Sequence, residues 1–124
     1  MKYKLVERKN PQNPQAPAKL YAAPVTEGKL SQKEISAELV ALSSLTRGDV
    51  ANVVENLLDV IPKYLLMGRS VQLGDLGTMR ISFSSEGVDR AEEFSVGKIS
   101  GVRVVFTPSP SLRKNIAGIK FEKV

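Results

Sequence analysis

The sequence predicts an α+β fold, because two hydrophobic periods follow one another along the chain. Apolar residues recur at helical spacing between about residues 31 and 68 and alternate with polar residues between residues 71 and 106. A change of period from 3.6 to two marks the passage from helices to strands. The length of 124 residues, with 42% apolar and 25% charged residues, is ordinary for one small globular domain.

The first 29 residues predict a strand and a proline-rich extension. Tyr3 and Leu5 alternate weakly with Lys2 and Lys4, which indicates a short strand. Residues 10–28 hold four of the seven prolines, so we expect an extended linker or a surface loop there. The main domain is therefore expected to cover residues 30–124.

Two helices are predicted next, each by its N-terminal cap. Ser31 and Glu34 have the spacing of a capping box, and apolar residues follow at helical spacing. A second cap over Thr46–Asp49 precedes an apolar stripe of about four turns. Pro62 lies inside that stripe and should kink the second helix, because its nitrogen has no hydrogen to donate.

Strands are predicted after the helices. Residues 71–73 lead into a glycine-rich turn, and a half-buried strand follows over residues 78–84. A polar excursion over residues 85–101 separates it from a return strand at residues 102–106. Ser109 and the prolines beside it then begin a short helix, and residues 119–124 alternate as a last strand. The sequence leaves open whether this last strand pairs with the first.

Composition excludes several functions. The chain has no cysteine and no histidine, which removes thiolate and imidazole metal ligands and the usual nucleophile–base pairs. We therefore expect no catalytic residues, no metal, no cofactor and no small-molecule ligand. No apolar run is long enough to span a membrane, and the first residues lack the apolar core of a signal peptide, so we expect a cytoplasmic protein.

Positive charge gathers at the two ends of the chain. The net charge is +5, with +4 over residues 1–30 and +3 over residues 107–124, while the middle is slightly acidic. Charge that folding does not require is available for phosphates, so we expect an anionic partner. Alternation places Arg80 and Arg103 on the polar face of the predicted hairpin. We propose six candidate DNA contacts, with ordinary solubilising charge as the alternative: Arg80, Arg90, Lys98, Arg103, Arg113 and Lys114.

The second helix carries more apolar surface than the small sheet can cover. Leaving several Leu and Val side chains in water would forfeit several kcal/mol, at about 25 cal/mol per Å² of apolar surface. That loss is comparable to the whole stability of a small domain. We therefore expect a homodimer, since two-fold dimers are the commonest oligomers.

The residues from Val71 to Ile81, VQLGDLGTMRI, resemble the central signature of the bacterial histone-like HU/IHF proteins, V-x-L-x-G-F-G-T-F-x-V in outline. Residues 104–108 and 112–114 resemble the family's return strand and its short basic helix. The resemblance covers about residues 30–117. The N-terminal extension and the last strand are similar to a divergent Bacteroidetes-type HU-like subgroup.

This resemblance implies an intertwined dimer. Each chain would supply two N-terminal helices, a three-stranded β-sheet with a long β-arm, a short C-terminal helix and extra terminal strands. Family members are nucleoid-associated proteins that bind double-stranded DNA with little sequence specificity and bend or condense it. By position, Arg80 and Arg103 fall on the saddle strands, Arg90 and Lys98 on the arm, and the last two candidates on the flanking helix.

The arm departs from the family pattern. The family's arm is rich in arginine and has a proline at its tip, whereas residues 84–101 contain no proline and carry a net charge of −2. Val88 or Phe94 could replace the proline as a wedge between base pairs, or could simply pack. The alternative function is therefore a dimeric protein–protein interaction scaffold, with an acidic arm and no DNA role.

Overall fold

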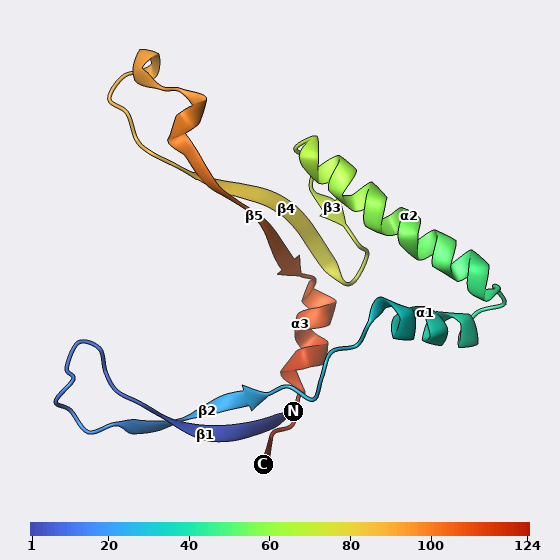
Figure 1. Ribbon diagram of the computed structural model, residues 1–124, viewed down its shortest axis with the longest axis horizontal. Coiled ribbons are helices and arrows are strands. Elements are labelled where there is room, and N and C mark those ends of the chain that lie inside the picture. The colour runs from blue at the N-terminus through green and yellow to red at the C-terminus, as the bar shows by residue number, and fades with distance from the viewer.

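The computed structural model describes residues 1–124 and contains two small sheets and three α-helices (Figure 1). The first sheet has the order β2–β1–β6, with β1 at Lys2–Arg8, β2 at Lys19–Val25 and β6 at Glu122–Lys123. The second has the order β3–β4–β5, with β3 at Val71–Gln72, β4 at Gly77–Ser85 and β5 at Ile99–Pro108. The helices are α1 at Gln32–Ala41, α2 at Arg47–Leu66 and α3 at Pro110–Ala117. The predicted α+β class is therefore confirmed.

Both predicted N-terminal caps are present. The Ser31 amide donates to the Glu34 carboxylate at 2.7 Å, while the Ser31 hydroxyl accepts from the Glu34 amide at 3.2 Å. The hydrogen bond that the Ser31 amide donates to this carboxylate, with a smaller contribution from the Ser31 side chain, lowers the pKa of Glu34 because it favours the charged form. Thr46 and Asp49 make the same reciprocal pair at the start of α2. Helix α2 continues through Pro62 to Leu66, so this proline does not end the helix.

The proline-rich extension is not only a loop. Strand β2 lies within it and pairs antiparallel with β1, from Lys2 opposite Val25 to Arg8 opposite Lys19. The expected extended linker or surface loop over residues 10–28 is corrected for this part, because residues 19–25 form a paired strand. Strand β2 is an edge strand, where a proline such as Pro24 is tolerated because one side of the strand needs no amide hydrogen.

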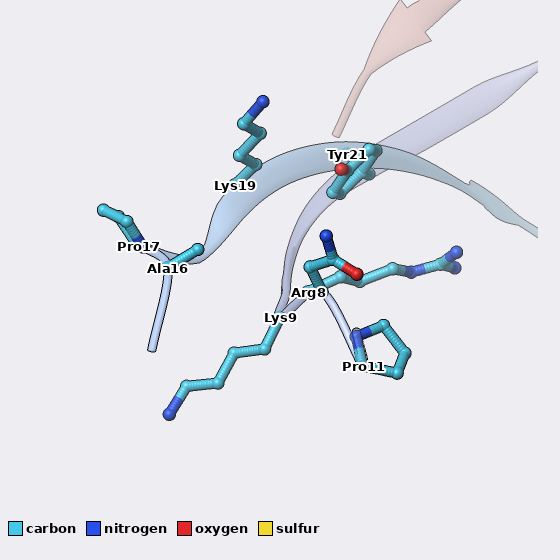
Figure 2. A pocket seen from close by; sticks show the side chains of 8 residues that line it. Arg8, Lys9, Pro11, Ala16, Pro17, Lys19 and Tyr21 are labelled. Atoms are coloured by element: carbon cyan, nitrogen blue, oxygen red, sulfur yellow. The ribbon is translucent and has the colours of Figure 1, made fainter. Parts of the chain in front are cut away.

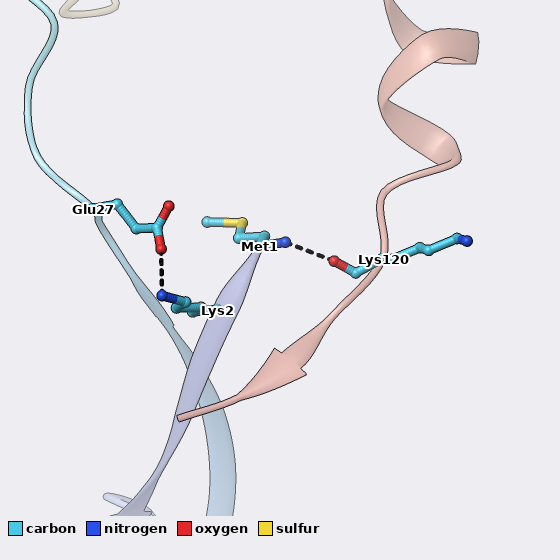
Figure 3. Close-up of polar contacts among 4 residues, drawn as sticks. All are labelled: Met1, Lys2, Glu27 and Lys120. Atoms are coloured by element: carbon cyan, nitrogen blue, oxygen red, sulfur yellow. Dashed lines mark hydrogen bonds and ion pairs between the residues drawn. The ribbon is translucent and has the colours of Figure 1, made fainter.

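The C-terminal strand completes this first sheet. Strand β6 pairs parallel with β1, with Lys2 opposite Glu122 and Tyr3 opposite Lys123. Figure 3 shows two further contacts nearby: the Met1 amino nitrogen donates to the Lys120 carbonyl at 2.6 Å, and Lys2 pairs with Glu27 at 2.7 Å. The two ends of the described chain therefore lie side by side.

The second sheet has the three strands that the resemblance implies. Strands β4 and β5 pair antiparallel from Gly77–Pro108 to Ser85–Ile99, with an irregularity between Ser82 and Ser84. Beyond Ser85, residues 91–93 and 96–98 form two 3₁₀ turns instead of extended strands. The expected long β-arm is thus a paired ribbon only at its base. Two glycines and four acidic residues in residues 86–98 favour turns over pairing.

Gly77 is buried at the start of β4. A Cβ atom there would overlap the Thr107 carbonyl and lie 2.7 Å from the Phe106 ring. We expect Gly77→Ala to lower the free energy of unfolding by about 1–3 kcal/mol, as overpacking does. Gly87→Ala is the matched control, because nothing lies within 4 Å of its Cβ position. Urea titrations of both variants test this, and equal stabilities would contradict it.

The single chain has almost no buried hydrophobic core. Val50 and Leu65 on α2 are the only buried hydrophobic residues, and many large apolar side chains are exposed. The chain exposes 10,642 Å². A compact monomer of this mass exposes about 6,500 Å². Figure 1 shows the reason: the two hairpins project away from the helices instead of packing on them.

None of the helices is both long enough and apolar enough to span a membrane.

Candidate nucleic-acid interface

One face of the β4–β5 ribbon carries two arginines. The register places Arg80 opposite Val105 and Ser82 opposite Arg103, and directly opposed residues share a face. The other face is apolar, because Met79 lies opposite Phe106 and Ile81 opposite Val104. The predicted separation of a basic face from an apolar face is therefore confirmed.

Both arginines on this face are exposed and form no ion pair within the chain. The Arg103 guanidinium donates to the Gly101 carbonyl at 3.1 Å and to the Ser84 hydroxyl at 3.4 Å. These contacts hold the side chain along the ribbon beside the strand irregularity without neutralising it. Arg80 makes no side-chain hydrogen bond within the chain, so its charge is free for an external anion.

Helix α3 begins directly at the end of the ribbon. Its cap residue, Ser109, accepts from the Leu112 amide at 3.0 Å and donates through its hydroxyl to the Asp75 carbonyl. The Ser109 amide also donates to the Leu76 carbonyl at 3.1 Å. These bonds fix the start of α3 on the turn between β3 and β4. The turn therefore sets where α3 presents its exposed cations relative to the ribbon: Arg113 and Lys114.

The other two candidate residues lie apart from this group. Arg90 and Lys98 belong to the segment beyond the paired ribbon, which Figure 1 places at the end farthest from α3. Lys98 forms an ion pair with Glu86 at 3.6 Å, and Arg90 directly precedes a turn that contains Glu92 and Glu93. Lys98 is therefore partly neutralised, whereas Arg90 forms no ion pair and is only close in sequence to the two glutamates. Phe94 beside them is 43% exposed, while Val88 is half-buried.

The structure adds a cationic group that the candidate set lacks. Arg8, Lys9 and Lys19 lie at the loop end of the β1–β2 hairpin, where they line a depression of about 550 Å³ (Figure 2). The charge of +4 over residues 1–30 was the signal for this group. Without the pairing of β1 with β2, that charge could not be placed on a surface.

No group of three or more Asp and Glu side chains is positioned to hold a metal ion.

Two helices before a three-stranded sheet, followed by a short basic helix, define an HU-like domain. The chain belongs to the HU-HIG family, described as an HU domain fused to wHTH, Ig, or glycine-rich motif, whose profile matches residues 1–123. The resemblance seen in the sequence is therefore confirmed.

A solved structure shares this fold. It is the crystal structure of a candidate bacterial DNA-binding protein from Bacteroides vulgatus ATCC 8482, with a TM-score of 0.63 and 22% sequence identity. The alignment covers 99% of this chain and 47% of that one, so the chain spans about half the length of this neighbour. Among curated proteins no significant match is found.

Proposed function

We propose that this chain is a non-enzymatic, histone-like protein that binds double-stranded DNA through its phosphates. The observation that carries the proposal is the exposed basic face of Arg80 and Arg103, next to α3 with Arg113 and Lys114. A charged ribbon face of this kind neutralises phosphates and reads little sequence. Membership of the HU-HIG family and the fold shared with the Bacteroides vulgatus protein support it. The place of action would be the bacterial nucleoid.

The functional unit in this proposal is a homodimer. The single chain exposes about 4,100 Å² more than a compact monomer of its mass, which exceeds the roughly 1,000–2,500 Å² that each partner of an obligate dimer buries. We expect the partner to pack on helix α2, because Val53, Leu57 and Val60 form an exposed apolar stripe beside the buried Val50 and Leu65. An intertwined pair of chains would cover this stripe. It would also join the basic faces of the two chains into one saddle-shaped surface, the saddle, formed by Arg80, Arg103, Arg113 and Lys114 of each chain.

The arm has a minor part in this proposal. Its net charge of −2 repels phosphate, so bending or compaction of DNA would arise from wrapping on the saddle. Phe94 is exposed enough to act as a wedge. A labelled short duplex separates the two: bending by wrapping leaves the end-to-end distance the same with the wild type and with Phe94→Ala, whereas a shorter distance with the wild type would assign the bend to the Phe94 wedge.

The proposal is tested by the double variant Arg80→Ala/Arg103→Ala. We expect its affinity for duplex DNA to fall about equally across sequences, with the slope of log K against log salt reduced by about one per lost contact. Fluorescence anisotropy with several random duplexes measures this. The control is Lys33→Ala/Arg47→Ala, which removes the same charge from the α1–α2 side. Unchanged binding by the arginine variant would remove this face from the interface.

A protein-binding scaffold is the second candidate, favoured by the acidic arm. Glu86, Asp89, Glu92 and Glu93 outnumber its two cations, and only Glu86 is in an ion pair. A dimer that ignores duplex DNA even in dilute buffer would favour this function over the first.

A further inference from the structure

The β1–β2 hairpin has one cationic face. Cross-strand partners share a face, so the pairs Lys4–Ala23 and Arg8–Lys19 lie on the same side of the ribbon. The single acidic residue of the two strands, Glu7, lies on the opposite side. The opposite side is otherwise apolar, with Tyr3, Leu5, Leu20, Ala22 and Pro24. The sequence alternation thus sorts the positive charge of this extension onto one surface.

The end of the hairpin concentrates charge that nothing in the chain neutralises. Arg8 and Lys19 are direct cross-strand partners, and Lys9 follows Arg8. Like charges directly opposite one another destabilise a hairpin. The two ion pairs of the chain involve Lys2 and Lys98, so no carboxylate offsets the repulsion at this end. An unfavourable arrangement of this kind is relieved when an anion binds.

The shape of this end fits an extended anion. Figure 2 shows that the side chains of Arg8, Lys9 and Lys19 spread apart around the depression instead of pointing at one centre. Five uncharged residues complete the lining: Asn10, Pro11, Ala16, Pro17 and Tyr21. A single small anion would need converging donors. Cations that spread apart match phosphates repeated along a backbone.

The hairpin is also placed to extend the proposed DNA surface. Figure 1 shows that α3 runs from the end of β5 to the first sheet, and that both hairpins project to the same side of the molecule. Helix α3 has eight residues and β1 has seven. They are therefore about 12 Å and about 23 Å long, which is enough for several phosphates. Arg113 and Lys114 lie between the two basic ribbons.

We propose that the cationic face of the β1–β2 hairpin is a second duplex-DNA contact, which binds the phosphate backbone beyond the saddle. This inference rests on the function proposed above and assigns to the N-terminal extension a role that the acidic β4–β5 arm cannot fill. The hairpin contact would lengthen the DNA-binding site without adding recognition of bases.

The test is the full chain with Arg8→Gln/Lys19→Gln, measured on a duplex of about 30 base pairs and on one of about 12 base pairs. We expect about tenfold weaker binding to the long duplex, a salt slope smaller by at least about one, and nearly wild-type binding to the short duplex. The melting temperature should be unchanged or slightly higher, because the variant removes a repulsive pair. A lower melting temperature would contradict the repulsion on which the inference depends.

The control Lys29→Gln/Lys33→Gln removes two charges from exposed positions that lie outside both basic surfaces. Equal losses in the control and the hairpin variant, or wild-type binding of the long duplex by the hairpin variant, would overturn the inference while leaving the saddle intact. If the wild type binds neither duplex, the proposed function itself fails. A loss seen equally on short and long duplexes would place the hairpin inside the saddle site and would also overturn the inference.

Discussion

Leu57→Asp is expected to convert a dimeric protein into a monomer. Leu57 lies in the exposed stripe of α2 and is 46% exposed in the single chain, so a charge there is tolerated in an isolated chain. In a dimer the same carboxylate would be buried without a partner, which costs several kcal/mol. We expect the dimer Kd to rise by about 100-fold or more, since each 1.4 kcal/mol is a factor of ten. Sedimentation equilibrium over a range of concentrations measures it.

Asn52→Asp is the matched control for this substitution. It introduces the same charge on the polar side of α2, where Asn52 already accepts a hydrogen bond from Asn56 at 3.2 Å. This control should keep the wild-type dimer Kd. A wild-type protein that sediments as a monomer, or a Leu57→Asp dimer of normal affinity, would contradict the proposed assembly.

Affinity for duplex DNA is expected to fall steeply with salt. Four saddle cations, Arg80, Arg103, Arg113 and Lys114, are free of ion pairs within the chain. If a complex uses about four phosphate contacts, log K falls against log salt with a slope of about −3.6, or about 100-fold between 50 and 200 mM. Each counterion that a phosphate contact releases adds to this slope, so the slope measures the number of phosphate contacts.

Anisotropy titrations at four salt concentrations measure this slope. An arm variant, Arg90→Ala, serves as the control, because Arg90 lies on the net-negative segment beyond the paired ribbon and its removal should leave the slope nearly unchanged. A slope near zero for the wild type would exclude a phosphate-based interface. A large loss of slope with Arg90→Ala would move the contact from the saddle to the arm.

Local signals were enough to predict the helices and the central sheet. Ser31 and Thr46 identified where the first two helices begin, because each side chain accepts a hydrogen bond from the amide three residues later. Alternation predicted the two faces of β4 and β5. Strand β2 was missed because pairing with β1 at the sheet edge, and not local preference, stabilises a segment that contains Pro24. The turns beyond Ser85 were missed because the polar composition of that segment suits either turns or an extended arm.

The candidate site was predictable only in part. Arg80 and Arg103 could be assigned to one face because strand alternation is a local property. The hairpin cations could not, because Arg8 and Lys19 are eleven positions apart and meet only through register. Arg90 and Lys98 were placed by family position, whereas the structure places them beyond the paired ribbon, where Lys98 is paired with Glu86.

The parallel pairing of β6 with β1 has a consequence for the order of folding. Lys2 and Glu122 are neighbours in space although nearly the whole chain separates them, so this pairing closes the longest loop in the molecule. Closing a long loop is slow and has a high entropic cost. A strand of two residues makes few interactions to offset that cost. The pairing of β6 with β1 should therefore form after the helices, the central sheet and the local β1–β2 hairpin. In native-state hydrogen exchange its amides should open first, as an independent unit.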